Sequence, residues 1–64
     1  MEDKKARFYQ VYSNLPLGVR EEIVVVLDDE PMSWKAVRLE IDNDTEKGQA
    51  ALQKIYDMKI IEET

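Results

Sequence analysis

Between residues 20 and 61 the chain alternates apolar segments with short polar breaks, and this alternation constrains the fold more than any other feature. The first apolar segment ends at an acidic run closed by a proline, over residues 28–31. Ser33, a residue type that favours helix N-termini, precedes the second segment. The third segment follows the polar run over 42–45, which is rich in turn-forming side chains. Because 64 residues suffice for one domain only, we expect these segments to form a single domain over residues 1–64.

The spacing of the apolar residues predicts a mainly helical fold. We expect a first helix over 3–13, which Pro16 separates from a second helix over 17–27. A third helix is expected over 33–41, capped by its serine, and a fourth over 45–58. The apolar residues expected to face the core are Phe8, Tyr12, Leu15, Val19, Ile23, Val26, Trp34, Val37, Ile41, Ala51, Leu52, Ile55 and Met58.

An alternative interpretation places a β-hairpin in the middle of the chain, at about 22–41. Residues 23–27 include β-branched side chains in series, which favour strands. Apolar and polar residues alternate over 35–41 with the period of a strand, and 28–31 would supply the loop. This α-β-β-α fold would leave a second apolar face that needs a partner, most simply another copy of the chain; that face would carry Val24, Val26, Trp34 and Ala36. We favour the helical interpretation and keep the hairpin as its alternative.

A Pro31-Met32-Ser33-Trp34 corner follows an apolar segment, and the end of the chain carries apolar residues at Leu52, Ile55, Met58, Ile60 and Ile61. With this corner and these apolar positions, residues 20–61 resemble the winged helix-turn-helix superfamily of archaeal and bacterial regulators. The resemblance implies a helix-turn-helix core at about 17–61 and a short C-terminal β segment at Ile60-Ile61. The chain departs from the family pattern at Arg38, Asp42, Asn43 and Gly48. At the last of these a branched apolar residue normally packs, and glycine mildly weakens a helix.

The resemblance also implies a DNA-facing surface at the start of the helix predicted over 45–58. Lys47 and Lys54 lie two turns apart on one helical face, and lysine and glutamine can contact phosphates or base edges. The candidate nucleic-acid-binding residues are Arg38, Thr45, Lys47, Gln49 and Lys54. DNA affinity depends mainly on phosphate neutralisation, however, and this chain has a net charge of −5 with no strongly basic segment. A solvated helix of mixed charge is therefore the simpler interpretation.

Three aromatic residues, Tyr9, Trp34 and Tyr56, are the candidates for a protein interface. On helices they would belong to the core, whereas on a hairpin Trp34 would face outward and anchor an interface. A core of this size is marginal, and the absence of cysteine excludes a disulfide that could reinforce it. We therefore expect association with a protein partner or with a second copy, as a homodimer.

The missing residue types narrow the possible functions. Without histidine or cysteine the chain lacks the usual general base and the usual zinc ligands. Its two glycines are isolated, so no phosphate-cradling loop is present. We expect no enzymatic activity, catalytic residue, metal, cofactor or small-molecule substrate. No run approaches the about 20 apolar residues of a membrane span, and the charged N-terminus has no signal core behind it. We expect a cytoplasmic protein that does not enter the membrane.

These observations favour a non-enzymatic docking module on a degenerate winged-helix scaffold, which binds another protein or itself. The alternative is a small DNA-binding transcriptional regulator that reads DNA with the helix at about 45–58. A basic face on the folded protein would favour the regulator, and an exposed apolar face would favour the docking module.

Overall fold

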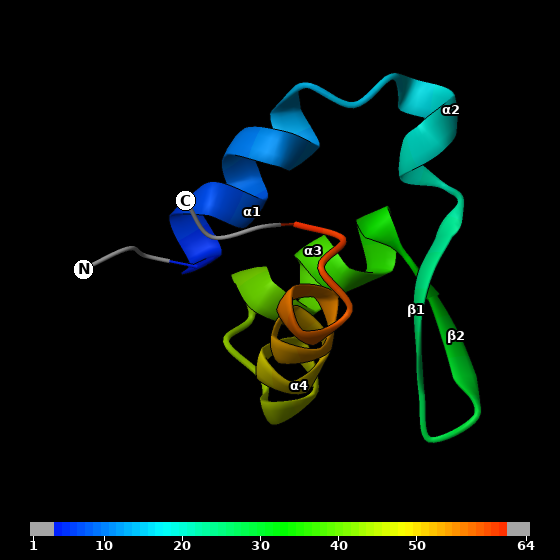
Figure 1. The fold of residues 1–64 in the computed structure, drawn as a ribbon, viewed down its shortest axis with the longest axis vertical. Coiled ribbons are helices and arrows are strands. Elements are labelled where there is room, and N and C mark those ends of the chain that lie inside the picture. Colours follow the sequence, from blue (N-terminus) through cyan, green and yellow to red (C-terminus); the bar gives the residue numbers. More distant parts are fainter. Residues whose placement is uncertain (1–3, 62–64) are drawn as a thin grey trace.

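A computed structural model describes residues 4–61, which form four helices and one antiparallel β-hairpin (Figure 1). In chain order the elements are α1 (Lys4–Ser13), α2 (Leu17–Arg20), β1 (Ile23–Leu27), β2 (Glu30–Ser33), α3 (Trp34–Asp42) and α4 (Glu46–Asp57). The prediction of a mainly helical fold is confirmed, with a two-stranded hairpin between the helices. Residue 3, where the first helix was predicted to begin, lies outside the described residues. None of the helices within 4–61 is long and apolar enough to cross a membrane.

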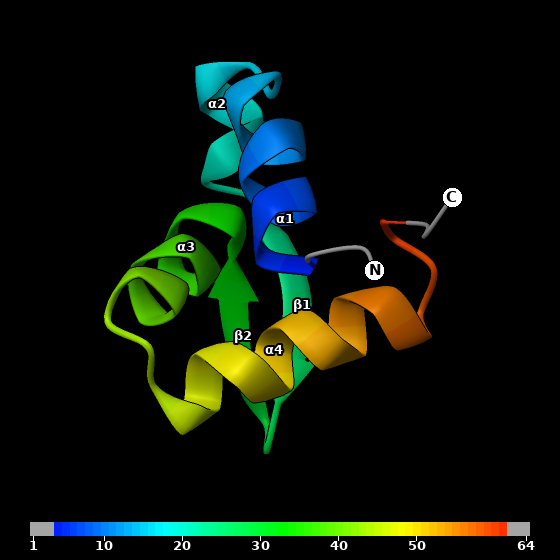
Figure 2. The same ribbon diagram turned by 90° about the vertical axis from the view of Figure 1, so that its left-hand side faces the viewer.

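The helices and the hairpin enclose one core. α4 packs against both α3 and β1, and α1 contacts α3 and α4. Figure 2 shows α4 passing across the two strands, with α1 and α2 at the opposite end of the molecule from the hairpin turn. The hairpin therefore has one face toward α4 and another directed away from the helices.

The middle of the chain forms a β-hairpin, as the alternative interpretation proposed. The helix predicted over 17–27 is therefore wrong for most of its length, because only 17–20 are helical and 23–27 form a strand. The stiff β-branched residues of β1 favour an extended backbone. Asp28 and Asp29 form the turn with φ of 48° and 67°, a left-handed conformation that aspartate tolerates better than most residues. The strands pair Ile23 with Ser33, Val25 with Met32, Val26 with Pro31 and Leu27 with Glu30, with a bulge between Ile23 and Val25.

The second strand predicted over 35–41 is also wrong, because α3 begins there. β2 ends at Ser33, whose Oγ accepts a hydrogen bond from the Ala36 amide at 3.1 Å and caps α3. Trp34, Val37 and Ile41 bury one face of this helix, as the helical interpretation predicted. The predicted third and fourth helices are thus confirmed close to their expected bounds.

The core includes Phe8 of α1, which is fully buried. Its ring stacks on Tyr12 and Trp34, with centroid separations of 6.1 Å and 5.9 Å. The buried apolar residues are Phe8, Tyr12, Val25, Met32, Trp34, Val37, Ile41, Ala51, Leu52, Ile55, Tyr56 and Ile61. Three residues predicted for the core are exposed instead, namely Ile23, Val26 and Met58. Val26 is exposed because strand alternation turns it away from the side on which Val25 is buried. Ile23 is exposed because the bulge between Ile23 and Val25 shifts the alternation before Val25.

The C-terminal β segment predicted at Ile60-Ile61 is not a strand, because α4 ends in a Schellman turn. The Ile60 amide donates to the Ile55 carbonyl oxygen at 3.0 Å, and the Lys59 amide donates to that of Tyr56 at 3.0 Å. Lys59 adopts a left-handed φ of 58°. The turn reverses the chain, so Ile61 is buried against the core and not extended along a strand.

Replacing Lys59 with glycine is expected to stabilise the fold. The left-handed conformation costs an L-residue roughly 1 kcal/mol and glycine almost nothing, so the free energy of unfolding should rise by about 0.5 kcal/mol after the entropy of the unfolded glycine is included. Urea unfolding followed by Trp34 fluorescence measures the change. Lys35→Gly, in the first turn of α3, is the matched control and should lower stability by about 1 kcal/mol. A loss of stability in Lys59→Gly would contradict the assigned turn.

Candidate docking surface

α3 and α4 meet at Gly48, in the first turn of α4. A Cβ added to Gly48 would lie 2.7 Å from the carbonyl carbon of Glu40 and 2.9 Å from the amide nitrogen of Ile41. Real side chains do not approach a backbone so closely, so only glycine fits. The expectation that Gly48 merely weakens its helix is therefore corrected: its missing side chain lets the two helices touch.

Thr45 is the N-cap of α4 and holds the turn between α3 and α4. Its Oγ1 accepts a hydrogen bond from the Gly48 amide at 3.0 Å and donates one to Oε1 of Glu40 at 2.7 Å. The side chain is only partly exposed. Thr45 is thus engaged in the structure of the turn.

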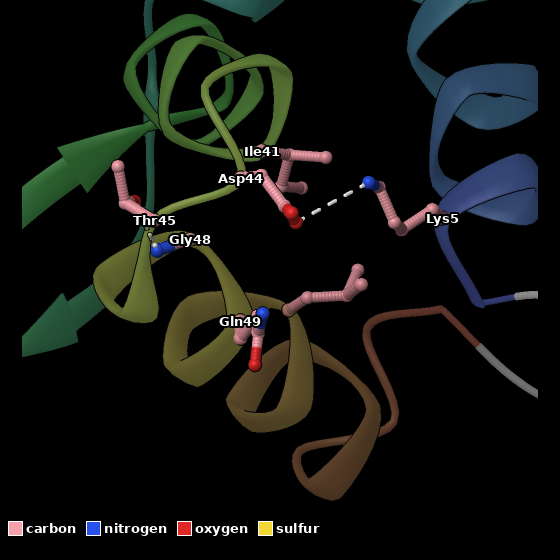
Figure 3. A pocket seen from close by; sticks show the side chains of 7 residues that line it. Lys5, Ile41, Asp44, Thr45, Gly48 and Gln49 are labelled. Atoms are coloured by element: carbon pink, nitrogen blue, oxygen red, sulfur yellow. Dashed lines mark hydrogen bonds and ion pairs between the residues drawn. The ribbon is translucent and has the colours of Figure 1, made fainter.

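Gln49 lines a small pocket between α1 and the start of α4 (Figure 3). Lys5 of α1 and Asp44 of the turn form an exposed ion pair of 3.7 Å across this pocket. Leu52 contributes apolar lining. An exposed ion pair of this kind contributes little to stability, and the pocket is too small to hold more than a water-sized group.

Lys47 and Lys54 share one face of α4, as their spacing predicted, and that face is directed at the hairpin. The Lys47 ammonium lies 2.5 Å from Oε1 of Glu30 in β2, and this hydrogen bond raises the pKa of Lys47 above its ordinary value of 10.5. The Lys54 ammonium donates to the carbonyl oxygen of Val26 in β1 at 2.6 Å. Both ammonium groups therefore form intramolecular hydrogen bonds that hold α4 against the hairpin.

Arg38 lies on the α1 side of α3, away from the two lysines of α4. Its guanidinium is 3.7 Å from Asp42, one turn along the helix, and 5.1 Å from the ring centroid of Tyr12. Arg20 of α2 lies over the same ring at 4.6 Å. The hydroxyl of Tyr9 donates to Asp42, so α1 and α3 are linked by a small network of charged and aromatic side chains.

The ionisation of Tyr9 reports on this network. The hydrogen bond to Asp42 is the main cause that raises the pKa of Tyr9 above 10.0, followed by desolvation and the negative charge of Asp42. The contribution to stability is complete below the ordinary tyrosine pKa and is lost as the pH rises through the raised value. The difference between spectrophotometric titrations of the native protein and Tyr9→Phe should show a transition above 10.0. Asp42→Asn should lower it, and a transition at or below the ordinary value would contradict the contact.

The residues that the sequence suggested for nucleic-acid binding thus lie on separate surfaces of the protein. The α4 lysines contact the hairpin, Gln49 lies toward α1, and Arg38 lies over Tyr12. Of the aromatic candidates, Trp34 and Tyr56 are buried in the core, and Tyr9 is half-buried at the contact between α1 and α3. These positions do not form a single basic or aromatic surface.

Three apolar residues on the outside of the hairpin form a surface that contains none of the candidate residues discussed above. Ile23 is 57% exposed and Val26 is 46% exposed, and Val26 pairs with the exposed Pro31. We call Ile23, Val26 and Pro31 the hairpin face. The alternative interpretation named Val26 for such a face but also Val24, which packs against the core. The bulge in β1 explains the difference, because it shifts the alternation of the residues before Val25.

Both edges of the hairpin carry features that hinder the addition of another strand. The carbonyl oxygen of Val26 in β1 already accepts a hydrogen bond from Lys54. Pro31 in β2 has no N–H to donate. Since pairing with a further strand needs free backbone donors and acceptors, the face of this hairpin is more accessible than its edges.

Within residues 4–61 no group of three or more carboxylates, histidines or cysteines is placed to hold a metal ion.

Comparison of the chain with protein-family models, with curated proteins and with solved structures found no match in any of the three.

Proposed function

We propose that this chain is a non-enzymatic docking module that binds a second protein through the hairpin face. The observation that carries the proposal is the exposure of Ile23 and Val26 on the outer side of a strand whose inner residue, Val25, is fully packed. Single exposed apolar residues are common on proteins. Here an exposed pair, Val26 with Pro31, lies on the same strand surface as Ile23, and adjacent apolar residues of this kind are typical of interaction sites.

The scaffold on which this face stands is, on our proposal, a degenerate winged helix. The arrangement of α3, a capped turn and α4 supports a helix-turn-helix core, and the close contact at Gly48 fixes the two helices relative to each other. α4 in turn holds the hairpin through Lys47 and Lys54. The helices therefore position the hairpin, which is the interacting surface.

A DNA-binding regulator is the alternative, and the α3–α4 pair is the feature that favours it. On this alternative Lys47 and Lys54 would have to leave Glu30 and Val26 in order to reach phosphate. DNA binding measured at two salt concentrations tests it, because phosphate contacts weaken steeply as salt rises. Lys47→Glu combined with Lys54→Glu should abolish such binding, whereas a docking module should bind no DNA in either form.

Site-specific photo-crosslinking in cells tests the docking function. A photoreactive residue at position 26 should yield a discrete protein adduct, and the additional change Ile23→Thr should abolish it. The same photoreactive residue at Leu39 is the control, since Leu39 is 54% exposed on α3 and lies outside the hairpin face. Equal adducts at positions 26 and 39, or none at 26, would refute the docking function.

A further inference from the structure

We propose that the hairpin face binds a basic amphipathic helix of another protein, and not a second copy of this chain. The inference rests on the docking function proposed above and adds the chemistry of the partner. It follows from the charges that surround the face, from what a two-fold dimer would bring together, and from the blocked edges of the hairpin.

Acidic side chains lie at both ends of β1. Glu21 and Glu22 precede the strand, and Asp28 and Asp29 follow it in the exposed turn. Within the described residues none of these four carboxylates forms an ion pair. The chain carries no basic residue between positions 21 and 31. The apolar hairpin face is therefore bordered at both of its ends by carboxylates that form no ion pair within the described residues.

An open pocket between the hairpin turn and α4 adds further negative charge at the same end. It is lined by the carboxylates of Asp28, Glu30 and Glu46, together with Leu27 and Ala50. The one cation in its lining, Lys47, is already bonded to Glu30. The pocket opens on the α4 side of the hairpin, so its two remaining carboxylates, Asp28 and Glu46, add negative charge around the turn end but do not line the hairpin face itself.

A homodimer through this face would place like charges together. A two-fold interface uses the same surface of both copies. Whether the two β1 strands met parallel or antiparallel, an acidic end would face an acidic end, because both ends of β1 are acidic. Of the basic residues near the face, Arg20 lies over Tyr12, Lys47 contacts Glu30 and Lys54 donates to the Val26 carbonyl oxygen. Lys35 lines a pocket with Arg20 and Glu21, but it forms no ion pair with any of the four acids within the described residues. The charges thus favour a basic partner over a second copy.

The size and edges of the face indicate the form of the partner. Three exposed apolar side chains form a surface much smaller than the roughly 800 Å² per partner of a typical stable protein–protein interface. A short segment matches such a surface better than a folded domain. Since Lys54 and Pro31 hinder strand addition, the segment is expected to lie on the face as an amphipathic helix, with apolar residues against Ile23 and Val26.

Binding of two synthetic peptides tests the inference. One is an amphipathic helix of leucine and lysine, and the other replaces each lysine by glutamate. Titration calorimetry should detect binding of the lysine peptide alone. Ile23→Thr with Val26→Thr, which keeps the β-branched shape, should weaken binding about tenfold or more, and Leu39→Gln on α3 should leave it unchanged.

A matched pair of charge variants separates specific from general attraction. Asp28→Asn with Asp29→Asn neutralises the turn and keeps a residue type that tolerates left-handed backbone. Asp44→Asn with Asp57→Asn changes the net charge equally at other places, and Asp44 also has a positive φ of 55°. The first pair should weaken binding by several-fold more than the second.

Three results would overturn the inference. The first is equal binding of the lysine peptide to the hairpin-face variant, and the second is equal effects of the two charge pairs. The third is a dimeric mass in solution that Ile23→Thr with Val26→Thr reduces to a monomer. This third result would leave the docking function intact and replace only the partner, whereas the loss of the position-26 adduct in the crosslinking experiment would remove the docking function itself.

Discussion

Replacing Phe8 with alanine is expected to unfold the protein at room temperature. Phe8 is fully buried and stacks on Tyr12 and Trp34, so it connects α1 to α3. Truncation of a buried phenylalanine costs about 3–5 kcal/mol, and the single core of a domain below about 70 residues rarely supplies more than about 3–5 kcal/mol. We therefore expect loss of the far-UV helical signal and a red shift of Trp34 emission in the absence of denaturant.

Two variants accompany this prediction. Phe8→Leu keeps most of the apolar volume and should remain folded with a loss of about 1 to 2 kcal/mol. Gln10→Ala, at an exposed position of the same helix, should change the urea midpoint very little. A Phe8→Ala protein with a native urea midpoint would show that α1 does not belong to the cooperative core.

Gly48→Ala is expected to be the second most damaging single change. The new Cβ would lie 2.7 Å from the Glu40 carbonyl carbon and 2.8 Å from its oxygen, and these atoms belong to the backbone of α3. α3 and α4 would have to move apart, which costs about 3 kcal/mol, while alanine gains about 1 kcal/mol in helix propensity. The expected net loss in the free energy of unfolding is about 2 kcal/mol, measured by urea unfolding.

The other glycine of the chain supplies the matched control. Gly18 lies in α2, and a Cβ added there meets no atom within 4 Å. Gly18→Ala should therefore be neutral or stabilise by up to about 1 kcal/mol. If Gly48→Ala proved as stable as Gly18→Ala, the close contact between α3 and α4 would be wrong. A branched residue at position 48, as in the winged-helix pattern, would require a wider helix pair than this one.

The second half of the chain could be predicted because its local signals agree. Ser33 and Thr45 are capping residues, and both do cap α3 and α4. The apolar residues after each cap recur at helical spacing, so one face is buried in each helix. Where capping, spacing and burial indicate the same element, the sequence is sufficient.

The first helix was also predicted, since α1 occupies 4–13 of the 3–13 expected, but the segment that follows it could not be predicted in the same way. The segment over 17–27 has apolar residues at helical spacing, but its β-branched residues favour a strand. Contacts distant in sequence decide between the two: Val25 packs into the core opposite Met32, and Lys54 binds the Val26 carbonyl. The bulge in β1 then exposes Ile23 and not Val24, a detail that no local pattern indicates.

The same division applies to the candidate surface. Sequence alone determined that Lys47 and Lys54 share a helical face, that acids border residues 23–27, and that Ser33 caps a helix, because each follows from spacing or position along one segment. Only the tertiary structure decided that the two lysines contact the hairpin, that Gly48 joins two helices, and that Ile23, Val26 and Pro31 stay exposed. These features depend on contacts between segments that are distant in the sequence. Which segments come into contact is determined by the packing of the whole core.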